Sequence, residues 1–475
     1  MPRAEILDVD GDGFPAGDDC DDEDEAVHPG AAESCNDVDD DCDGTLDVLA
    51  DCSWFGDIEA FEEADAQLTA VPVANRLRLL GDLDGDGAGE VGFVGGQSWP
   101  YTLFVVDGPR SGATTFADAS PASITSASGT DWFSIRSAGD VNGDGLADLV
   151  VGPDYLDDGE GEPIGACHLL LGPFEGGIVA SESAALTLVG ESPQDGLGVQ
   201  IETLSDIDGD GVPDFAVSAY QADNLHGVTY VVSGASTGEV QLADVSTRLV
   251  GRVWSGEQLA AGDFNGDGMD DLIVGEPSYP EIDYPEGGFY VLHSPFDGTI
   301  ALEIDSDAIV RNLDSGYFAT AMDTLGDVDG DGYDDLVASF RRLDVPASAL
   351  IFRGPIESSG DPVALAWAGI SNEGGRAPAE ENIQSAGDVD GDGRTDVLLG
   401  SPARDEPEGA VYLFYGVTAG THQLMDASAV FSGDPEHRVG WAFAGGDDLD
   451  GDGLDDVVIS GWGEETSDLA FFYGR

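Results

Sequence analysis

Residues 139–153 read GDVNGDGLADLVVGP, an acidic loop that continues directly into a run of apolar and β-branched residues. The acidic part follows the pattern Asp-x-Asp/Asn-Gly-Asp-Gly-x-x-Asp/Glu, and the chain repeats this pattern seven times. The copies begin at Asp82, Asp140, Asp206, Asp263, Asp327, Asp388 and Asp448. Successive copies start 58, 66, 57, 64, 61 and 60 residues apart. A recurrence of this length indicates a repeat architecture, and each unit has the length of one four-stranded propeller blade.

The acidic residues of each copy have the spacing of a metal-binding loop. Side chains at positions 1, 3, 5 and 9 can surround one cation, together with the backbone carbonyl at position 7. Oxygen ligands in this number favour Ca²⁺, because Mg²⁺ retains more water and requires a stricter octahedron. Glycine at positions 4 and 6 permits backbone angles that other residues resist. We therefore expect about seven calcium ions in this part of the chain. The predicted ligands are Asp82, Asp84, Asp86, Ala88 and Glu90; Asp140, Asn142, Asp144, Leu146 and Asp148; Asp206, Asp208, Asp210, Val212 and Asp214; Asp263, Asn265, Asp267, Met269 and Asp271; Asp327, Asp329, Asp331, Tyr333 and Asp335; Asp388, Asp390, Asp392, Arg394 and Asp396; and Asp448, Asp450, Asp452, Leu454 and Asp456.

The EF-hand loop is a rival interpretation, because it opens with the same residues. An EF-hand requires an acidic residue at position 12. The seven copies have only apolar residues there, namely Phe93, Val151, Val217, Val274, Ala338, Leu399 and Ile459. Position 9 is acidic in every copy, so the loop closes three residues earlier and enters a strand. This excludes an EF-hand, and a plain Asp-Gly turn would explain one copy but hardly seven.

Four β-strands are predicted in each of the first six repeats. One precedes the acidic loop, an apolar strand follows it, and two more segments rich in aromatic or β-branched residues come next. The seventh repeat lacks a fourth strand, because the sequence stops at Arg475. A spare segment, Gln67–Val71, precedes the first repeat, and we expect it to complete the last blade. The predicted fold is all-β: a seven-bladed β-propeller of four-stranded antiparallel blades over 65–475, closed by an N-terminal strand.

The antiparallel strands of a blade place successive loops on alternate faces of the ring. All seven acidic loops join first to second strands, so we expect them on one face, called here the acidic-loop face. Second-to-third and fourth-to-first connections lie on the opposite face. Aromatic residues, which often anchor interfaces, are predicted in the loops of the opposite face. They are Trp132, Tyr155, Tyr220, Trp254, Tyr279, Tyr284 and Trp462.

The repeat resembles the FG-GAP repeat of integrin α-subunit propellers and their bacterial relatives. The resemblance rests on Gly139–Gly145 and Asp148–Pro153, recurs in seven copies, and covers about residues 65–475. It implies that the acidic loops bind Ca²⁺. The Phe-Gly half of the signature is poorly kept, appearing as Leu197-Gly198 and Val439-Gly440. Nothing outside the propeller resembles the rest of an integrin, so a receptor role is not implied.

Residues 1–52 form a different segment, with almost no apolar residues to bury, so we expect it to fold around cations and disulfides. Two loops have calcium-type acid spacing: Asp8, Asp10, Asp12, Phe14 and Asp19, then Asp39, Asp41, Asp43, Thr45 and Asp47. The segment resembles the acidic, cysteine-containing metal-binding motif of bacterial surface proteins and, in style, thrombospondin type 3 repeats. That motif class is associated with copper, but oxygen-rich ligands with one histidine, His28, favour one to three Ca²⁺. An acidic disordered tail is the alternative.

Four of the five cysteines lie in the same segment: Cys20, Cys35, Cys42 and Cys52. They suggest two disulfides and an oxidising compartment, with three possible pairings. Reduced thiols as metal ligands are the alternative, although no Cys-x-x-Cys spacing is present. Cys167 lies in an apolar run and is expected to be a buried small hydrophobe. Residues 53–64 are expected to form a linker or a short helix.

The charge of the chain restricts its partners. It has 96 acidic and 16 basic residues, all of the latter arginine, for a formal net charge of −80. Such a field repels nucleic acid and anionic lipid and favours cations or basic partners. No stretch is long and apolar enough to span a membrane. The start lacks the apolar core of a signal peptide, so for an extracellular or cell-surface protein we expect a truncated boundary, with an export signal elsewhere as the alternative.

No catalytic constellation is evident, so the chain is not expected to be an enzyme. The six histidines are scattered, and Gly234–Gly238 matches Gly-x-Ser-x-Gly without a convincing helix after it. We expect a calcium-binding propeller for adhesion or protein recognition, with its protein or glycan partner on the opposite face. Two alternatives stay open: a lectin-like propeller whose aromatic residues stack on sugars, and an exported hydrolase or lyase with acids in the central channel. The sequence does not indicate an oligomeric state.

Overall fold

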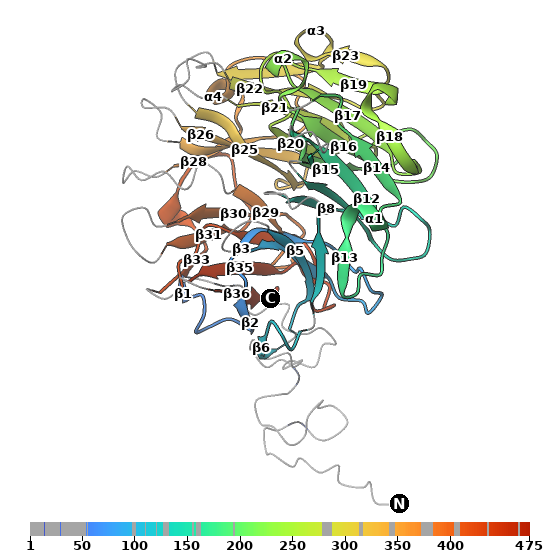
Figure 1. The fold of residues 1–475 in the computed structure, drawn as a ribbon. Coiled ribbons are helices and arrows are strands. Elements are labelled where there is room, and N and C mark those ends of the chain that lie inside the picture. The colour runs from blue at the N-terminus through green and yellow to red at the C-terminus, as the bar shows by residue number, and fades with distance from the viewer. Residues whose placement is uncertain are drawn as a thin grey trace, which may run out of the picture.

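In the computed structural model, seven β-sheets follow one another around a ring (Figure 1). The described residues are 14, 29, 54, 56–96, 101–109, 111–119, 121–126, 133–153, 156–157, 163–192, 195–277, 287–312, 317–341, 347–371, 383–402, 409–434, 437–463 and 466–475. The predicted calcium loops and disulfides of residues 1–52 lie outside the described residues, apart from Phe14 alone. They therefore stay predictions.

Each blade has four antiparallel strands, as the sequence predicts, with its acidic loop between the first and second; the strands follow chain order in every blade but the seventh. Blades 1 to 4 comprise β3 (Ala74–Leu79), β4 (Glu90–Gly95), β5 (Thr102–Asp107) and β7 (Ala122–Thr125); β8 (Phe133–Gly139), β9 (Asp148–Pro153), β12 (Ala166–Leu170) and β14 (Leu186–Val189); β15 (Leu197–Leu204), β16 (Asp214–Ala219), β17 (Val228–Ser233) and β19 (Thr247–Val250); and β20 (Gln258–Gly262), β21 (Asp271–Glu276), β22 (Gly287–Leu292) and β24 (Ala308–Asn312). Blades 5 to 7 comprise β25 (Tyr317–Gly326), β26 (Asp335–Arg341), β27 (Ala347–Phe352) and β28 (Ala368–Ser371); β29 (Ile383–Gly387), β30 (Asp396–Ser401), β31 (Ala410–Phe414) and β33 (Ala429–Ser432); and β34 (Phe443–Gly445), β35 (Val457–Trp462), β36 (Ser467–Phe472) and β2 (Ala66–Val71).

The two ends of the domain close the ring, as predicted. Strand β2 pairs antiparallel with β36, with Leu68 opposite Leu469, and so supplies the fourth strand of blade 7. In Figure 1 these blue and red strands lie side by side. Arg475 and Asp65 also form an ion pair across the junction. Closure covers the edge of β36 that would otherwise be free to recruit other chains.

Closure involves more of the N-terminal chain than we expected. Where the sequence suggested a linker or short helix in residues 53–64, the structure has a strand, β1 (Gly56–Glu59), parallel to β33 of blade 6. Just before it, Trp54 is buried, with its ring edge-on to Phe431 and Phe472. The segment is ordered in this way because blade 6 presents a free strand edge and an aromatic surface at this point. Nothing in the local sequence pattern reveals either partner.

Strand β1 belongs to a series of outer strands that the sequence did not predict. In most blades the connection from third to fourth strand forms a short strand that pairs in parallel with the fourth strand of the preceding blade. These outer strands are β6 (Gly112–Thr115), β13 (Gly177–Val179), β18 (Gly238–Gln241), β23 (Thr299–Ala301) and β32 (Gly420–Gln423). Blade 5 instead makes one parallel bridge, from Gly360 to Val310. The outer strands thus tie neighbouring blades together at the rim.

The remaining elements are short and lie in connections. They are α1 (Ala180–Ser183), α2 (Ala222–Leu225), α3 (Leu302–Asp305), α4 (Pro362–Leu365), η1 (Leu242–Asp244), η3 (Leu424–Asp426), β10 (Leu156–Asp157) and β11 (Pro163–Ile164). Residues 234–237 lead into strand β18 and not into a helix, so they form a turn and not a nucleophile elbow.

The apolar core is divided among the blade interfaces. Seven clusters of buried side chains are present in the described residues, and each is shared by two neighbouring blades. One of them joins blades 7 and 1, with Leu68 and Phe471 packed against Phe93. Fully burying one such side chain stabilises the fold by about 1.5–3 kcal/mol. Cys167 is buried in the interface of blades 2 and 3, as predicted.

Candidate metal centres

The acidic loops lie next to one another on one face of the ring. Hydrogen bonds link adjacent loops directly: Gly89 N donates to Asp448 O at 3.1 Å, and Ala147 N donates to Asp82 O at 3.1 Å. Each loop is followed by a strand, and the apolar residue at position 12 has no exposed surface in any of the seven copies. The exclusion of an EF-hand therefore stands.

Each loop is shaped by its own first aspartate. The carboxylate at position 1 accepts the backbone N–H of the glycine at position 6 in all seven copies, at 2.7–3.0 Å. The glycines at positions 4 and 6 all have positive φ, for example +85° at Gly85 and +88° at Gly87. This conformation costs glycine little and other residues more. The Asp-x-x-Gly-x-Gly spacing thus folds the loop tightly around one carboxylate.

The aspartate at position 5 is held in the same way. Its carboxylate accepts the backbone N–H of position 7 in every copy, at 2.9–3.2 Å. The bond uses one oxygen of position 5; in blade 3 the other oxygen of Asp210 accepts the hydroxyl of Ser233 at 3.0 Å. The position-5 carboxylate and the carbonyl of position 7 belong to the predicted ligand set.

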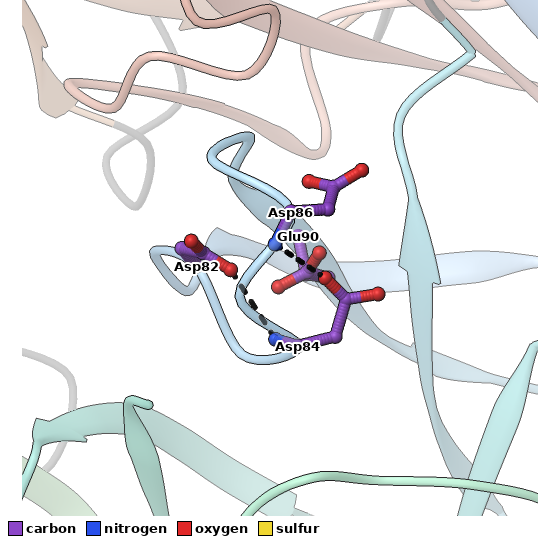
Figure 2. A group of neighbouring side chains, drawn as sticks. All are labelled: Asp82, Asp84, Asp86 and Glu90. Atoms are coloured by element: carbon purple, nitrogen blue, oxygen red, sulfur yellow. Dashed lines mark hydrogen bonds between the residues drawn. The ribbon is translucent and has the colours of Figure 1, made fainter. Parts of the chain in front are cut away.

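Figure 2 shows the arrangement in blade 1, where Asp82, Asp84, Asp86 and Glu90 group around a single loop. One oxygen from each of the four carboxylates lies within 4.8 Å of the others. The dashed lines mark the bonds from Asp84 N to Asp82 and from Asp86 N to Asp84, at 3.3 and 3.0 Å. Glu90 enters from the start of β4 and supplies the most deeply buried carboxylate.

Four further loops bring three carboxylates equally close together. They are Asp206, Asp208 and Asp210; Asp327, Asp329 and Asp335; Asp388, Asp390 and Asp396; and Asp448, Asp450 and Asp456. The loops of blades 2 and 4 have asparagine at position 3. There the side-chain amides of Asn142 and Asn265 donate to the carboxylate at position 9, at 3.4 and 3.1 Å. Within the described residues, the loops of blades 2 and 4 have one carboxylate fewer and do not bring three carboxylates this close together.

The carboxylate at position 9 is buried in every blade, with at most 3% of its surface exposed. Burial, followed by the charges of the other loop acids, raises the pKa of Glu90, Asp396 and Asp456 to about 8. Burial likewise raises the pKa of Asp271 and Asp335 to about 7, although backbone N–H groups partly offset the effect. A buried carboxylate with a raised pKa favours either a proton or a nearby cation.

Unsatisfied oxygen atoms show that a cation fits these loops. The described residues contain four buried carboxylate oxygens without a hydrogen-bond partner: Asp214 Oδ1, Asp271 Oδ2, Asp329 Oδ1 and Asp388 Oδ1. All four belong to acidic loops, at positions 9, 9, 3 and 1. Leaving a buried charged group unpaired is costly. A hard cation with oxygen ligands would satisfy these atoms and offset the repulsion between the carboxylates.

Two roles in the loops escaped the sequence analysis. Position 8 is aspartate in three blades, where its carboxylate accepts a backbone N–H from the preceding blade at 2.7 Å: Asp270 from Ser205, Asp334 from Asp263, and Asp455 from Asp388. These acids join blades and do not belong to the predicted ligand set. Their recurrence at position 8 is the signal that an alignment of the repeats would have revealed.

Arg353 has the second role that the sequence analysis missed. It follows β27 in blade 5, and its Nη1 lies 3.1 Å from Asp329 Oδ2 while its Nε lies 3.6 Å from Asp331 Oδ2. One permanent positive charge therefore sits beside the acids of this loop, where it partly compensates them.

On the opposite face, the structure describes three of the seven aromatic residues predicted there. Trp462 is 41% exposed, whereas Tyr220 and Trp254 are half-buried. Trp132, Tyr155, Tyr279 and Tyr284 lie outside the described residues. The sequence analysis missed Trp441, which is 42% exposed and stands edge-on to Trp462, with 6.5 Å between ring centroids.

Comparison with known families supports the repeat assignment. The FG-GAP repeat family matches residues 198–242, 255–292 and 385–414, which lie in blades 3, 4 and 6. A metal-binding motif family named Cu-binding_MopE matches residues 19–47. That segment lies outside the described residues, so calcium as its preferred ion stays a prediction.

The similar curated proteins are integrin α chains. Integrin alpha pat-2 of Caenorhabditis briggsae is 24% identical over 262 residues, which cover 54% of this chain and 17% of the integrin. Integrin alpha-PS2 of Drosophila melanogaster is 29% identical over 240 residues, covering 46% and 16%. The match thus spans about a sixth of the length of each integrin.

Solved structures also match most of this chain, at low sequence identity. The WD40 domain of Toxoplasma gondii coronin has a TM-score of 0.45 and 11% identity, over 89% of this chain and 90% of that one. The rhamnogalacturonan lyase YesW has a TM-score of 0.39 and 11% identity, over 84% of this chain and 72% of that one.

Among the described residues, no helix has the length and apolar character to cross a membrane. The family and sequence matches show that the chain contains FG-GAP repeats in the matched ranges, and that about half of it is similar in sequence to integrin α chains.

Proposed function

We propose that the chain is an extracellular or cell-surface calcium-binding propeller that recognises a protein partner in adhesion. Its homology to integrin α chains supports both the location and the adhesive role. The acidic loops would hold about seven Ca²⁺ through side chains at positions 1, 3, 5 and 9, and thereby fix the first hairpin of each blade. The chain contributes binding, and the integrin-like homology favours this over catalysis.

The observation that carries the recognition role is the tryptophan pair Trp441 and Trp462. Trp441 precedes β34, which runs toward the acidic loop, and Trp462 ends β35, which runs away from it. Both side chains therefore lie on the face opposite the acidic loops. Tryptophan is enriched among residues that contribute most to interface affinity. Two adjacent and exposed tryptophans in a chain of this charge form an anchor for a partner.

The calcium ions would act on this surface indirectly. Repulsion among uncompensated carboxylates at one end of the β34–β35 hairpin would loosen the hairpin, and the tryptophans stand at its other end. Partner binding should therefore require calcium even though the partner does not touch the ions.

A binding panel tests the proposal. The immobilised chain, with calcium, is exposed to purified extracellular matrix proteins, to basic surface proteins and to a glycan array. We expect calcium-dependent binding of a protein, lost in a Trp441→Ala/Trp462→Ala variant and retained in Met425→Ala. Met425 is 86% exposed in η3, away from the tryptophan pair, and so serves as a control. Binding that is confined to glycans would overturn protein recognition in favour of the lectin alternative.

A further inference from the structure

A cavity of about 660 Å³ lies at the centre of the ring. It is lined by residues from the first strand, or the turn just before it, of all seven blades. Its volume is within the range of small-molecule binding sites. Trp441 is part of the lining and is 42% exposed, so it marks the opening on the face opposite the acidic loops.

The cavity concentrates the rare positive charge of this chain. Three of its 16 basic residues, Arg76, Arg78 and Arg136, line the wall formed by blades 1 and 2. Arg136 already forms an ion pair with Glu202, because its Nε and Nη2 donate to the Glu202 carboxylate at 3.1 and 2.5 Å. A chain with 96 acidic residues has no need of arginine here for solubility, so the cluster requires another explanation.

Arg78 has no acidic partner at contact distance among the described residues. Its hydrogen bond within the described residues runs from Nη1 to Leu77 O at 2.8 Å, and no carboxylate of these residues forms an ion pair with it. Burial and then the neighbouring charge of Arg136 lower the pKa of Arg78 to about 10, although Asp323 and Glu202 act in the opposite direction. A guanidinium with unused donors in a cavity is a site for an anion, and a carboxylate matches its planar geometry.

The neutral lining points to a hydroxylated ligand. Gln200, Gln258 and Gln384 reach the cavity from three blades. None of these three side chains makes a hydrogen bond to another described residue. Each amide offers both donors and an acceptor, which is the complement of sugar hydroxyl groups. The indole face of Trp441 at the opening adds a flat apolar surface of the kind that covers a pyranose ring.

We propose that the central cavity binds the end of an acidic saccharide, with the sugar carboxylate on Arg78, hydroxyl groups on the glutamine amides, and one ring against Trp441. The proposal shares Trp441 with the proposed protein surface, but it can be tested separately, because Arg78 and the three glutamines line the cavity and do not belong to the tryptophan pair. The lining also holds three acids, Glu202, Glu257 and Asp323, so a ligand with a single carboxylate end fits better than a polyanion.

Calorimetric titration of the full, calcium-loaded chain tests the proposal. The probes are a trisaccharide that carries galacturonate at one end only, its neutral galactose counterpart and inorganic phosphate, all at constant ionic strength. We expect the galacturonate trisaccharide to bind with 1:1 stoichiometry, and the other two to bind at least tenfold more weakly. The Arg78→Gln variant should bind the acidic sugar roughly 10- to 100-fold more weakly, the effect of losing one charge-assisted hydrogen bond.

The matched control is Arg248→Gln, which removes the same charge from a partly exposed position in strand β19, outside the cavity lining. It should leave sugar affinity within about twofold of wild type, because a charge outside the cavity does not contact the sugar and is screened. Thermal unfolding in calcium checks that both variants fold. Equal binding of the acidic and neutral sugars, equal loss of affinity in both variants, or no binding of the acidic sugar would each overturn the proposal. Phosphate binding as tightly as the sugar would overturn saccharide recognition.

Discussion

Replacing Trp54 with alanine should weaken the closure of the ring. Trp54 is 7% exposed and lies before β1, outside the blades that its side chain contacts. Its ring centroid is 5.7 Å from that of Phe431 in blade 6 and 5.8 Å from that of Phe472 in blade 7, with interplanar angles of 74° and 80°. The side chain therefore holds the N-terminal segment against two blades at once.

The magnitude follows from burial and from the two aromatic contacts. Truncating a buried Phe or Trp to Ala generally costs about 3–5 kcal/mol of unfolding free energy, including the cavity left behind. Each edge-on aromatic pair accounts for roughly 0.5–1.5 kcal/mol beyond the area buried. We expect the Trp54→Ala variant to lose about 3–5 kcal/mol, and its N-terminal segment to become more susceptible to proteolysis.

Equilibrium unfolding in urea with saturating calcium measures this loss, followed by both circular dichroism and fluorescence to check that one transition occurs. Trp462→Ala is the matched control, because the same residue type is removed from a position that is 41% exposed. The control should stay within about 1 kcal/mol of wild type. If Trp54→Ala were no less stable than the control, with unchanged proteolysis, the role of Trp54 in closure would be refuted.

Three further predictions concern charge. Because the position-9 carboxylates have raised pKa values in the metal-free fold, the folded chain binds more protons than the unfolded chain between about pH 4 and 8. The free energy of unfolding of the metal-free chain should therefore fall as pH rises through this window. Chelation should lower the melting temperature more at pH 8 than at pH 5, and an equal loss at both pH values would contradict this reasoning. Asp396→Asn should stabilise the chelated protein at pH 8, yet remove one calcium ion and destabilise the calcium-loaded protein, as calorimetry with and without chelator will show; lower stability in both states would contradict it. His437 lies between Asp434 and Asp468, at 3.0 and 3.1 Å; burial lowers its pKa, but the two acids outweigh burial and raise it. The stabilisation that protonated His437 gives the fold is complete below pH 6.5 and is lost as pH rises through the raised pKa of His437. His437→Gln should therefore lower the free energy of unfolding more at pH 6 than at pH 9. A loss that does not depend on pH would refute this role.

The repeated features of the chain were accessible from sequence. Seven acidic loops, apolar residues at position 12 and the missing last strand together predict seven blades and closure by Gln67–Val71, and the structure agrees. These inferences succeed because each depends on local spacing that recurs in every blade. The glycine positions are equally predictable, since the tight loop requires positive φ at both.

Features that depend on a neighbouring blade were not predicted. The outer strands, such as Gly112–Thr115, are short and mostly exposed, and they pair with a blade that the local pattern does not specify. Trp54 is buried for the same reason, among residues that otherwise read as an acidic linker. Arg78 and Arg136 occupy equivalent strand positions, four residues before their loops, but the other blades have different residues there. Only the closed ring brings such non-repeated residues together.

The calcium content of the full chain tests the central claim most directly. The chain is stripped with chelator, reloaded with calcium, passed through a desalting column and analysed for bound metal by elemental analysis. We predict about seven calcium ions in the propeller and one to three in residues 1–52, with reloading restoring the melting temperature that chelation lowers. Fewer than seven bound ions, or a melting temperature indifferent to chelation, would contradict the assignment of the acidic loops as calcium sites.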